Sequence, residues 1–116
     1  MKHVRFLYKS TCTTCRDART FLHGLRGVEL DERDYAKAPF TPDELRTIFK
    51  DRDPRDYLNP RSPAYKAMGL AKKSLTRDDA IALMLRDSNL LKRPLVIMGE
   101  EFITGFDRDR LASLAK

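Results

Sequence analysis

The chain has 116 residues, of which 23 are lysine or arginine and 17 are aspartate or glutamate, so its formal net charge is +6. This length fits one domain with a single hydrophobic core. The two charge signs are mixed along the chain, and no basic run interleaved with aromatic residues appears, so direct nucleic-acid binding is not predicted. The first residues never form the hydrophobic run of a secretion signal or a membrane span, and we expect a cytoplasmic protein without membrane attachment.

The first third of the sequence predicts a strand, a helix and a second strand. Residues 3–8 alternate apolar and polar side chains, as a half-buried strand does, and residues 28–33 alternate again. From Thr13 onward the apolar residues recur at helical spacing, and this helix is predicted to end between Gly24 and Gly27. A helical crossover between the two strands makes them parallel.

The middle of the sequence predicts helices in place of strands. Thr41, Ser62 and Thr76 each offer a capping hydroxyl, and each is followed by proline or acidic residues that favour the first turn of a helix. Residues 51–60 contain two prolines and predict a loop. We therefore interpret residues 38–91 as a helical insertion.

The last third of the sequence returns to strands. Residues 95–98 and 102–104 predict a hairpin whose turn, residues 99–101, begins with Gly99. Asp107 is predicted to cap a final helix with Leu111 and Leu114 facing the core. This order indicates an α/β fold with a mixed four-stranded sheet and a helical insertion after the second strand. We predict a single domain, 1–116, whose core comprises 1–37 and 92–116.

The two cysteines, Cys12 and Cys15, lie three residues apart where the first strand gives way to the helix. Unpaired backbone N–H groups and the helix dipole stabilise an anion at this place, so the pKa of Cys12 should be lowered. Cys15 is one turn further along the helix, within reach of a mixed disulfide on Cys12. The spacing therefore predicts a redox pair with Cys12 as nucleophile and Cys15 as resolving thiol.

Two other interpretations of the cysteine pair remain open. The cysteines could pack as small apolar residues without reacting, or they could bind a metal ion. Zinc needs four ligands, however, and the two histidines, His3 and His23, are placed far from the pair along the strand and the helix. We therefore predict no metal site and no bound cofactor.

Arg93 and Pro94 precede the third predicted strand. A cis peptide bond at this proline would present backbone to the cysteine loop, although the sequence does not define the isomer. Arg93 would then direct a planar cation toward the thiolate, suited to an oxyanion or a carboxylate. Arg61 could do the same from the start of an insertion helix, although the residues around it favour an ordinary surface arginine.

Four segments of the sequence together resemble the ArsC/Spx family, and they cover nearly the whole chain: Lys9–Arg16 (KSTCTTCR), Asn59–Ser62, Leu91–Ile97 and Ile103–Phe106. The resemblance implies a thioredoxin-like sheet. The family includes glutaredoxin-linked arsenate reductases, Spx-type regulators that bind RNA polymerase, and redox proteins without an assigned role. In the reductases, the cysteine matching Cys12 attacks arsenate, and the arginines matching Arg61 and Arg93 hold the oxyanion before glutathione releases the arsenic.

The sequence departs from both branches of that family. The reductases carry a third arginine near the last strand, and in this sequence the segment around Gly105 and Phe106 stands in its place. Cys15 occupies a position where those enzymes usually lack a cysteine. The cysteine motif is more similar to the Spx branch, but residues 50–60 lack the glycine through which Spx proteins contact the polymerase α subunit. We predict a thiol-disulfide oxidoreductase acting on arsenate or disulfides, with a redox-switched regulator that binds RNA polymerase as the alternative.

The predicted site has a catalytic part and a substrate-binding part. The catalytic residues are Cys12, Cys15, Arg93 and Arg61, and the substrate-binding residues are Thr11, Thr13, Thr14 and Pro94. We expect glutathione, glutaredoxin or thioredoxin to donate the electrons, and we expect a monomer.

Overall fold

The computed structural model describes residues 2–115. The chain forms two compact units: one extends to Ala38 and resumes at Arg93, and the other spans Pro39–Lys92. None of the helices within the described residues combines the length and the hydrophobicity that a bilayer crossing would need.

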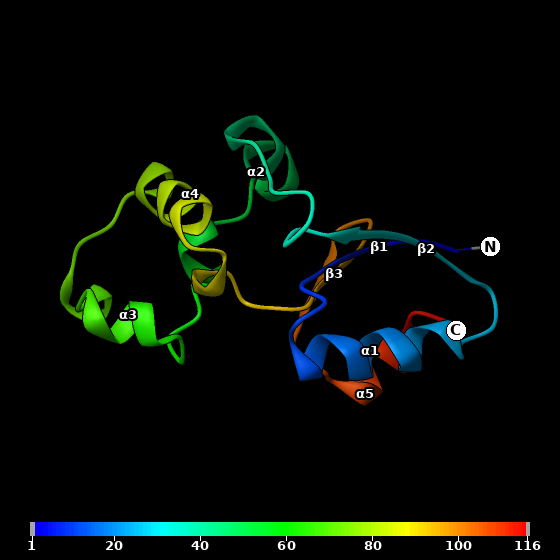
Figure 1. Cartoon of the computed structure of the whole chain (residues 1–116). Helices are drawn as coiled ribbons and strands as arrows, with labels where there is room; N and C mark the ends of the chain where they lie inside the picture. The colour runs from blue at the N-terminus through cyan, green and yellow to red at the C-terminus, as the bar shows by residue number, and fades with distance from the viewer. Residues whose placement is uncertain (1, 116) are drawn as a thin grey trace. The chain divides into compact units, whose positions relative to one another are not determined.

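The first unit is an α/β arrangement built on a four-stranded sheet (Figure 1). Its elements in chain order are β1 (Lys2–Tyr8), α1 (Thr13–His23), β2 (Val28–Asp34), β3 (Leu95–Met98), β4 (Glu101–Thr104) and α5 (Arg108–Ser113). The strand order is β2-β1-β3-β4, with β1 parallel to β2 and antiparallel to β3. This mixed sheet confirms the predicted thioredoxin-like fold class, and the α1 crossover explains the parallel pair.

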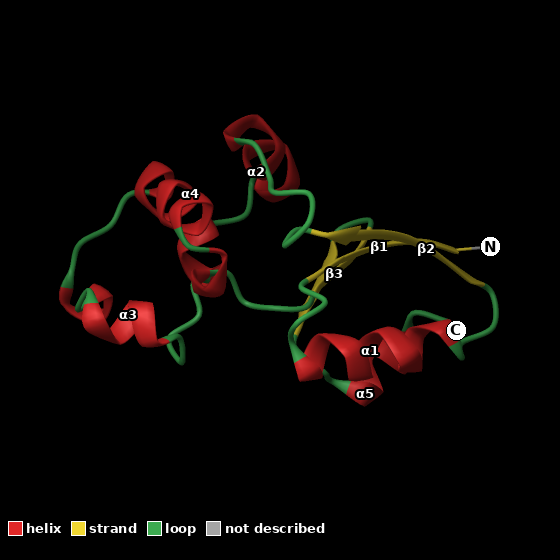
Figure 2. Ribbon diagram, viewed as in Figure 1, coloured by secondary structure: helices red, strands yellow, loops and turns green. Residues whose placement is uncertain are grey.

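Helices α1 and α5 lie together on one face of this sheet (Figure 2). Apolar residues two positions apart in a strand point to the same face, and they meet the apolar stripe of each helix. The resulting core consists of Val4, Phe6, Ala18, Leu22, Val96, Ile103, Leu111 and Leu114. As predicted, the side chain of Asp107 caps α5 by accepting a hydrogen bond from the N–H of Arg110 at 3.2 Å.

The hairpin between β3 and β4 has a shorter turn than predicted. Met98 pairs directly with Glu101, so Glu101 already belongs to β4 and the turn contains two residues, Gly99 and Glu100. A two-residue turn of this kind requires a left-handed residue, which Gly99 supplies with a φ of 59°.

The second unit contains three α-helices and three short 3₁₀ helices. They are α2 (Pro42–Phe49), η1 (Pro54–Tyr57), α3 (Pro63–Ala67), η2 (Leu70–Lys72), α4 (Arg77–Arg86) and η3 (Ser88–Leu90). Leu45, Ile48 and Phe49 of α2 and Ala80, Ile81 and Met84 of α4 supply buried side chains. The N–H of Asn59 donates to the carbonyl of Leu90 at 2.7 Å and joins the loop after η1 to the end of η3.

Two local predictions for this unit were wrong. The predicted loop at residues 51–60 contains the helix η1, because Asp53 accepts a hydrogen bond from the N–H of Arg55 and Pro54 occupies the first turn. Ser62 precedes α3 but does not cap it through its side chain. Its hydroxyl is buried and lacks a hydrogen-bond partner among the described residues, so α3 begins without the predicted cap.

Thr41 and Thr76 form the predicted capping boxes of α2 and α4. The hydroxyl of Thr41 accepts from the N–H of Glu44 at 3.2 Å, and the Glu44 carboxylate accepts from the N–H of Thr41 at 3.0 Å. Replacing Thr41 with alanine is expected to lower the free energy of unfolding by about 1 kcal/mol, because one helix N–H loses its partner. Urea denaturation tests this, and Thr47→Ala, at an exposed site inside α2, should cause no such loss.

Candidate functional site

The two cysteines lie where β1 passes into α1. The chain leaves β1 at Tyr8, turns through residues 9–11 and places Cys12 at the N-cap of α1 with an extended backbone. The N–H of Cys12 donates to the carbonyl of Lys9 at 2.9 Å, which closes this turn. The first turn of α1 contains no acidic residue, so no carboxylate competes with a thiolate for the free N–H groups of the helix.

The two sulfur-bearing side chains differ in their exposure. Cys12 is half-buried, whereas Cys15 is fully buried one helical turn later, and both are free thiols. A substrate can therefore reach Cys12 first, while Cys15 lies beneath it. This arrangement agrees with the order of reaction that the spacing predicts, although the reaction itself stays a prediction.

Hydrogen bonds lower the pKa of the Cys12 thiol. Partial burial has the largest effect and raises this pKa, but the Cys15 backbone N–H, the Arg93 guanidinium and the Cys15 thiol hydrogen-bond to the sulfur and together outweigh burial. The positive charge of Arg93 adds a further attraction. A larger share of Cys12 is therefore ionised at neutral pH than in an ordinary cysteine.

The pKa of Cys15 is raised to about 12, and burial is the largest cause. The hydrogen bond with Cys12 and the negative charge of its thiolate also raise this pKa, whereas the backbone N–H of Lys9 and the charge of Arg93 lower it. The environment thus separates the two thiols, with Cys12 ionising first.

The stability of the protein should fall at alkaline pH because of Cys15. An unfolded cysteine ionises near pH 9.0, while the folded Cys15 keeps its proton to about pH 12, so ionisation favours the unfolded chain between these values. At a pH of about 10 the loss is about 1 kcal/mol. Cys15→Ala should remove this part of the loss in urea titrations at pH about 8 and about 10. An equally steep decline in the variant would contradict the assignment.

Arg93 and Pro94 lie directly before β3, in the same unit as the cysteines. The peptide bond between them is cis, Pro94 is buried, and its carbonyl accepts a hydrogen bond from the N–H of Gly105 at 3.1 Å. The Arg93 guanidinium donates a hydrogen bond to the Cys12 sulfur. The structure thus brings Cys12, Cys15 and Arg93 together.

Arg93→Ala is expected to slow alkylation of Cys12 by iodoacetamide at neutral pH on the order of tenfold, because the thiolate loses a donor and a nearby positive charge. The rate should be followed across pH, where the midpoint moves upward. Arg93→Lys keeps a positive charge and should recover part of the rate. An unchanged pH profile in the alanine variant would show that Arg93 does not stabilise the thiolate.

The other predicted site residues are more exposed. Thr11 lies in the loop, while Thr13 and Thr14 begin α1 with exposed side chains. The Thr13 hydroxyl accepts a hydrogen bond from the Arg16 guanidinium at 3.4 Å. Arg61 belongs to the other unit, where its side chain is exposed and its backbone N–H donates to the Asn59 side chain at 3.1 Å. The role of Arg61 stays a prediction.

The sequence analysis missed Tyr35, which follows β2 and is only 3% exposed. Burial raises its pKa, and the next largest influences come from Cys15, Arg93 and Cys12, so its phenol lies in the electrostatic field of the site. The register of the two parallel strands was the signal that could have pointed to Tyr35. Two parallel strands of equal length end side by side, and the residue after the second then flanks the loop after the first.

Within residues 2–115 the side chains of His, Cys, Asp and Glu form no group of three or more that could hold a metal ion. His3 lies 3.8 Å from Asp31, and His23 lies 3.1 Å from Glu32, which also pairs with Arg19. Both histidines are exposed.

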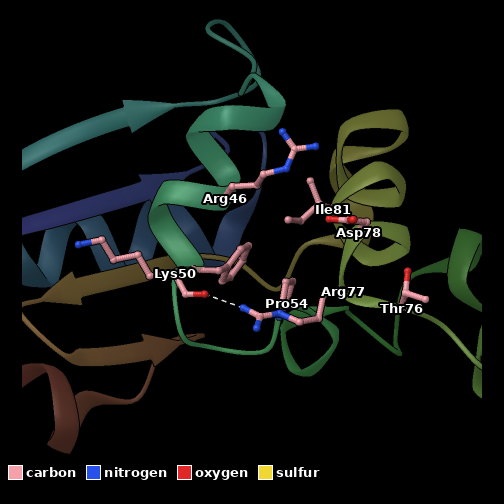
Figure 3. A pocket seen from close by; sticks show the side chains of 8 residues that line it. Arg46, Lys50, Pro54, Thr76, Arg77, Asp78 and Ile81 are labelled. Carbon is pink, nitrogen blue, oxygen red and sulfur yellow. Dashed lines mark hydrogen bonds between the residues drawn. The ribbon is translucent and has the colours of Figure 1, made fainter.

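The second unit has a cavity of its own between α2 and α4, with a volume of about 540 Å³ (Figure 3). Phe49, Pro54 and Ile81 form its apolar part, and it is also lined by Arg46, Lys50, Thr76, Arg77 and Asp78. The Arg77 guanidinium donates to the carbonyls of Lys50 at 2.6 Å and Arg52 at 2.8 Å. The lining therefore carries three cations and one carboxylate.

Comparisons with known proteins agree with this fold. The model of the ArsC family matches residues 7–114. An uncharacterised 15.7 kDa protein of Rhodospirillum rubrum is 32% identical over 108 residues, which are 93% of this chain and 75% of the relative. The global transcriptional regulator Spx of Streptococcus pyogenes serotype M1 is 27% identical over 110 residues, which are 93% of this chain and 81% of the regulator.

A solved structure shares the whole fold. It is described as a "possible arsenate reductase" from Streptococcus mutans UA159, and it has a TM-score of 0.72 and 25% sequence identity, with coverage of 96% of this chain and 98% of the other. A family match over nearly the full length, together with the cysteine motif at the start of α1, shows that the chain belongs to the ArsC family.

Proposed function

We propose that the protein is a thiol-disulfide oxidoreductase in which Cys12 is the nucleophile and Cys15 the resolving thiol. The observation that carries the proposal is the contrast between the two sulfur atoms. Cys12 is a half-buried thiol of lowered pKa at a helix N-terminus, which suits it to attack a substrate. Cys15 is a buried thiol of raised pKa, which suits it to react only in the second step, with the mixed disulfide. Arg93 supplies the cation that stabilises the first thiolate and can bind an anionic substrate.

The reaction with a disulfide proceeds in two exchanges. The Cys12 thiolate attacks one substrate sulfur, forms a mixed disulfide and releases the other sulfur as a thiolate, which takes up a proton. Cys15 then loses its proton, attacks the Cys12 sulfur and releases the second substrate thiolate. Two electrons pass from the dithiol to the substrate, and glutathione, glutaredoxin or thioredoxin returns them in the cytoplasm.

Arsenate fits the same site chemically. Cys12 would attack the arsenic atom, and one arsenate oxygen would leave as water. A second thiol, from Cys15 or glutathione, would then attack the Cys12 sulfur, form a disulfide and release the arsenic as arsenite, reduced by two electrons. Arg93, together with Arg61 as the resemblance implies, would hold the oxyanion during the attack.

A reductase assay across arsenate, glutathione mixed disulfides and protein disulfides tests the proposal, with each thiol donor supplied in turn. Arg61→Ala and Arg93→Ala should weaken arsenate reduction more than disulfide reduction, because only arsenate needs both cations. Absence of Cys12-dependent turnover with every substrate and donor would reject the enzyme.

A second candidate function is that of a redox-switched regulator that binds the RNA polymerase α subunit. The similarity to the regulator Spx favours it, as does the cavity between α2 and α4, whose excess of positive charge suits an acidic partner surface. Pull-downs of the α subunit with oxidised and reduced protein, and with Arg46→Ala, test this role. Recovery of no α subunit in either redox state would exclude it.

A further inference from the structure

We infer that Tyr35 is a positioning residue of the dithiol: its buried ring excludes water from Cys15, so that Cys15 remains a protonated thiol until Cys12 has formed a mixed disulfide. The inference rests on the proposed redox function and adds to it a residue that the cysteine motif does not contain.

The strand register brings Tyr35 to the site. Tyr8, the last residue of β1, lies opposite Asp34, the last residue of β2, and the N–H of Tyr35 donates to the carbonyl of Tyr8 at 3.0 Å. The cysteine loop begins directly after Tyr8. The N–H of Ser10 donates to the Asp34 carboxylate at 3.3 Å, so the middle of the loop is tied to the residue that precedes Tyr35.

The side chain of Tyr35 is enclosed in the folded chain. Only 3% of the residue is exposed, and its hydroxyl oxygen is buried as well. Among charged groups, Cys15 has the largest influence on its pKa, followed by Arg93 and Cys12. Because the effect of a charge weakens with distance, the phenol lies within electrostatic reach of the buried thiol.

The groups that influence Cys15 come from several elements. Cys12 at the N-cap of α1, the backbone N–H of Lys9 in the loop and Arg93 before β3 act through charge or hydrogen bonds. Tyr8 on β1 also feels the charge of Cys15, but its ring is only half-buried. It stacks on Phe6 at 4.9 Å and lies under the Arg19 guanidinium at 5.9 Å.

The two tyrosines near Cys15 therefore differ in what they can do. Tyr35 is almost completely buried, whereas the ring of Tyr8 stacks on Phe6 and is partly exposed to solvent. Removing the ring of Tyr35 should admit water beside the buried sulfur. Because water stabilises the thiolate, Cys15 would then ionise more readily and would compete with Cys12 for electrophiles.

The test measures Cys15 alone, in the Cys12→Ser background. Its ionisation is followed by the ultraviolet absorbance of the thiolate across pH, and its reactivity by the rate of iodoacetamide alkylation. Tyr35→Ala should lower the ionisation midpoint and accelerate alkylation about tenfold. Tyr35→Phe keeps the ring and should stay within about twofold of the background rate.

Two further variants keep the test decisive. Phe21→Ala removes a half-buried aromatic ring from α1 in the same unit and controls for general loosening of the fold. Tyr35→Leu retains apolar volume, so it serves if the alanine variant does not fold, and it should accelerate alkylation several-fold.

The inference is overturned if Tyr35→Ala and Tyr35→Leu leave the alkylation rate unchanged. It is also overturned if Tyr35→Phe or Phe21→Ala accelerates alkylation as much as Tyr35→Ala, since the hydroxyl or simple loosening would then be responsible. These measurements require no turnover. A wild-type protein that reduces no substrate would reject the proposed function while leaving the shielding of Cys15 measurable.

Discussion

Replacing Cys12 with serine is expected to lower disulfide and arsenate reduction on the order of a thousandfold or more, to the level of the uncatalysed reaction with the thiol donor. A serine hydroxyl is not ionised at neutral pH, and it cannot form the sulfur–sulfur bond that carries the electrons. Cys15 is unable to take over the attack because it is buried and its pKa is raised to about 12.

Cys15→Ser is the matched variant for this experiment. It should retain part of the activity when glutathione is the donor, because a glutathione thiol can resolve the mixed disulfide in place of Cys15. Turnover should be measured from donor oxidation under identical conditions for both variants. Wild-type turnover in Cys12→Ser would contradict the assignment of the nucleophile. A regulator, by contrast, should keep its reduced-state partner binding in Cys12→Ser.

Phe6→Ala should cause one of the largest losses of stability available in the first unit, about 3–5 kcal/mol. Phe6 lies in the middle of β1, is 0% exposed and belongs to the core between the sheet and the helices α1 and α5. Its ring also stacks on Tyr8 at a centroid distance of 4.9 Å, next to the cysteine loop. Alanine would leave a cavity that the paired strands cannot close.

Urea denaturation followed by circular dichroism measures this loss. Because globular domains are typically stable by about 5–15 kcal/mol, the variant should be partly unfolded at temperatures the wild type tolerates. Arg26→Ala changes an exposed residue of the same unit and should stay within about 0.5 kcal/mol of the wild type. A loss below about 1 kcal/mol for Phe6→Ala would mean that the core repacks.

Much of the fold could be predicted because local patterns and tertiary packing agree. The alternation in β1, the helical spacing in α1 and the capping boxes at Thr41 and Thr76 all depend on neighbouring residues, and each appears in the structure. The failures also have local causes. Ser62 carries a good capping side chain but buries it, and the short helix η1 uses Asp53 and Pro54, which equally favour a loop.

The candidate site was predictable only in part. The spacing of Cys12 and Cys15 and the arginine before Pro94 can be recognised along the chain, and the structure places these groups together. The involvement of Tyr35 depends on the pairing of β1 with β2, which brings two distant segments into register. Such pairing is a tertiary property that no window of neighbouring residues contains.

The pairing of β1 with β3 has a consequence for the growing polypeptide on the ribosome. The first strand and the cysteine loop are translated well before Arg93 and the strands that complete the sheet. Until those later segments emerge, both thiols belong to an unfinished chain, without the guanidinium that lowers the pKa of Cys12 and without the burial that raises the pKa of Cys15. The nascent protein therefore carries two ordinary cysteines, and their chemical difference arises only after β3 and β4 have been made.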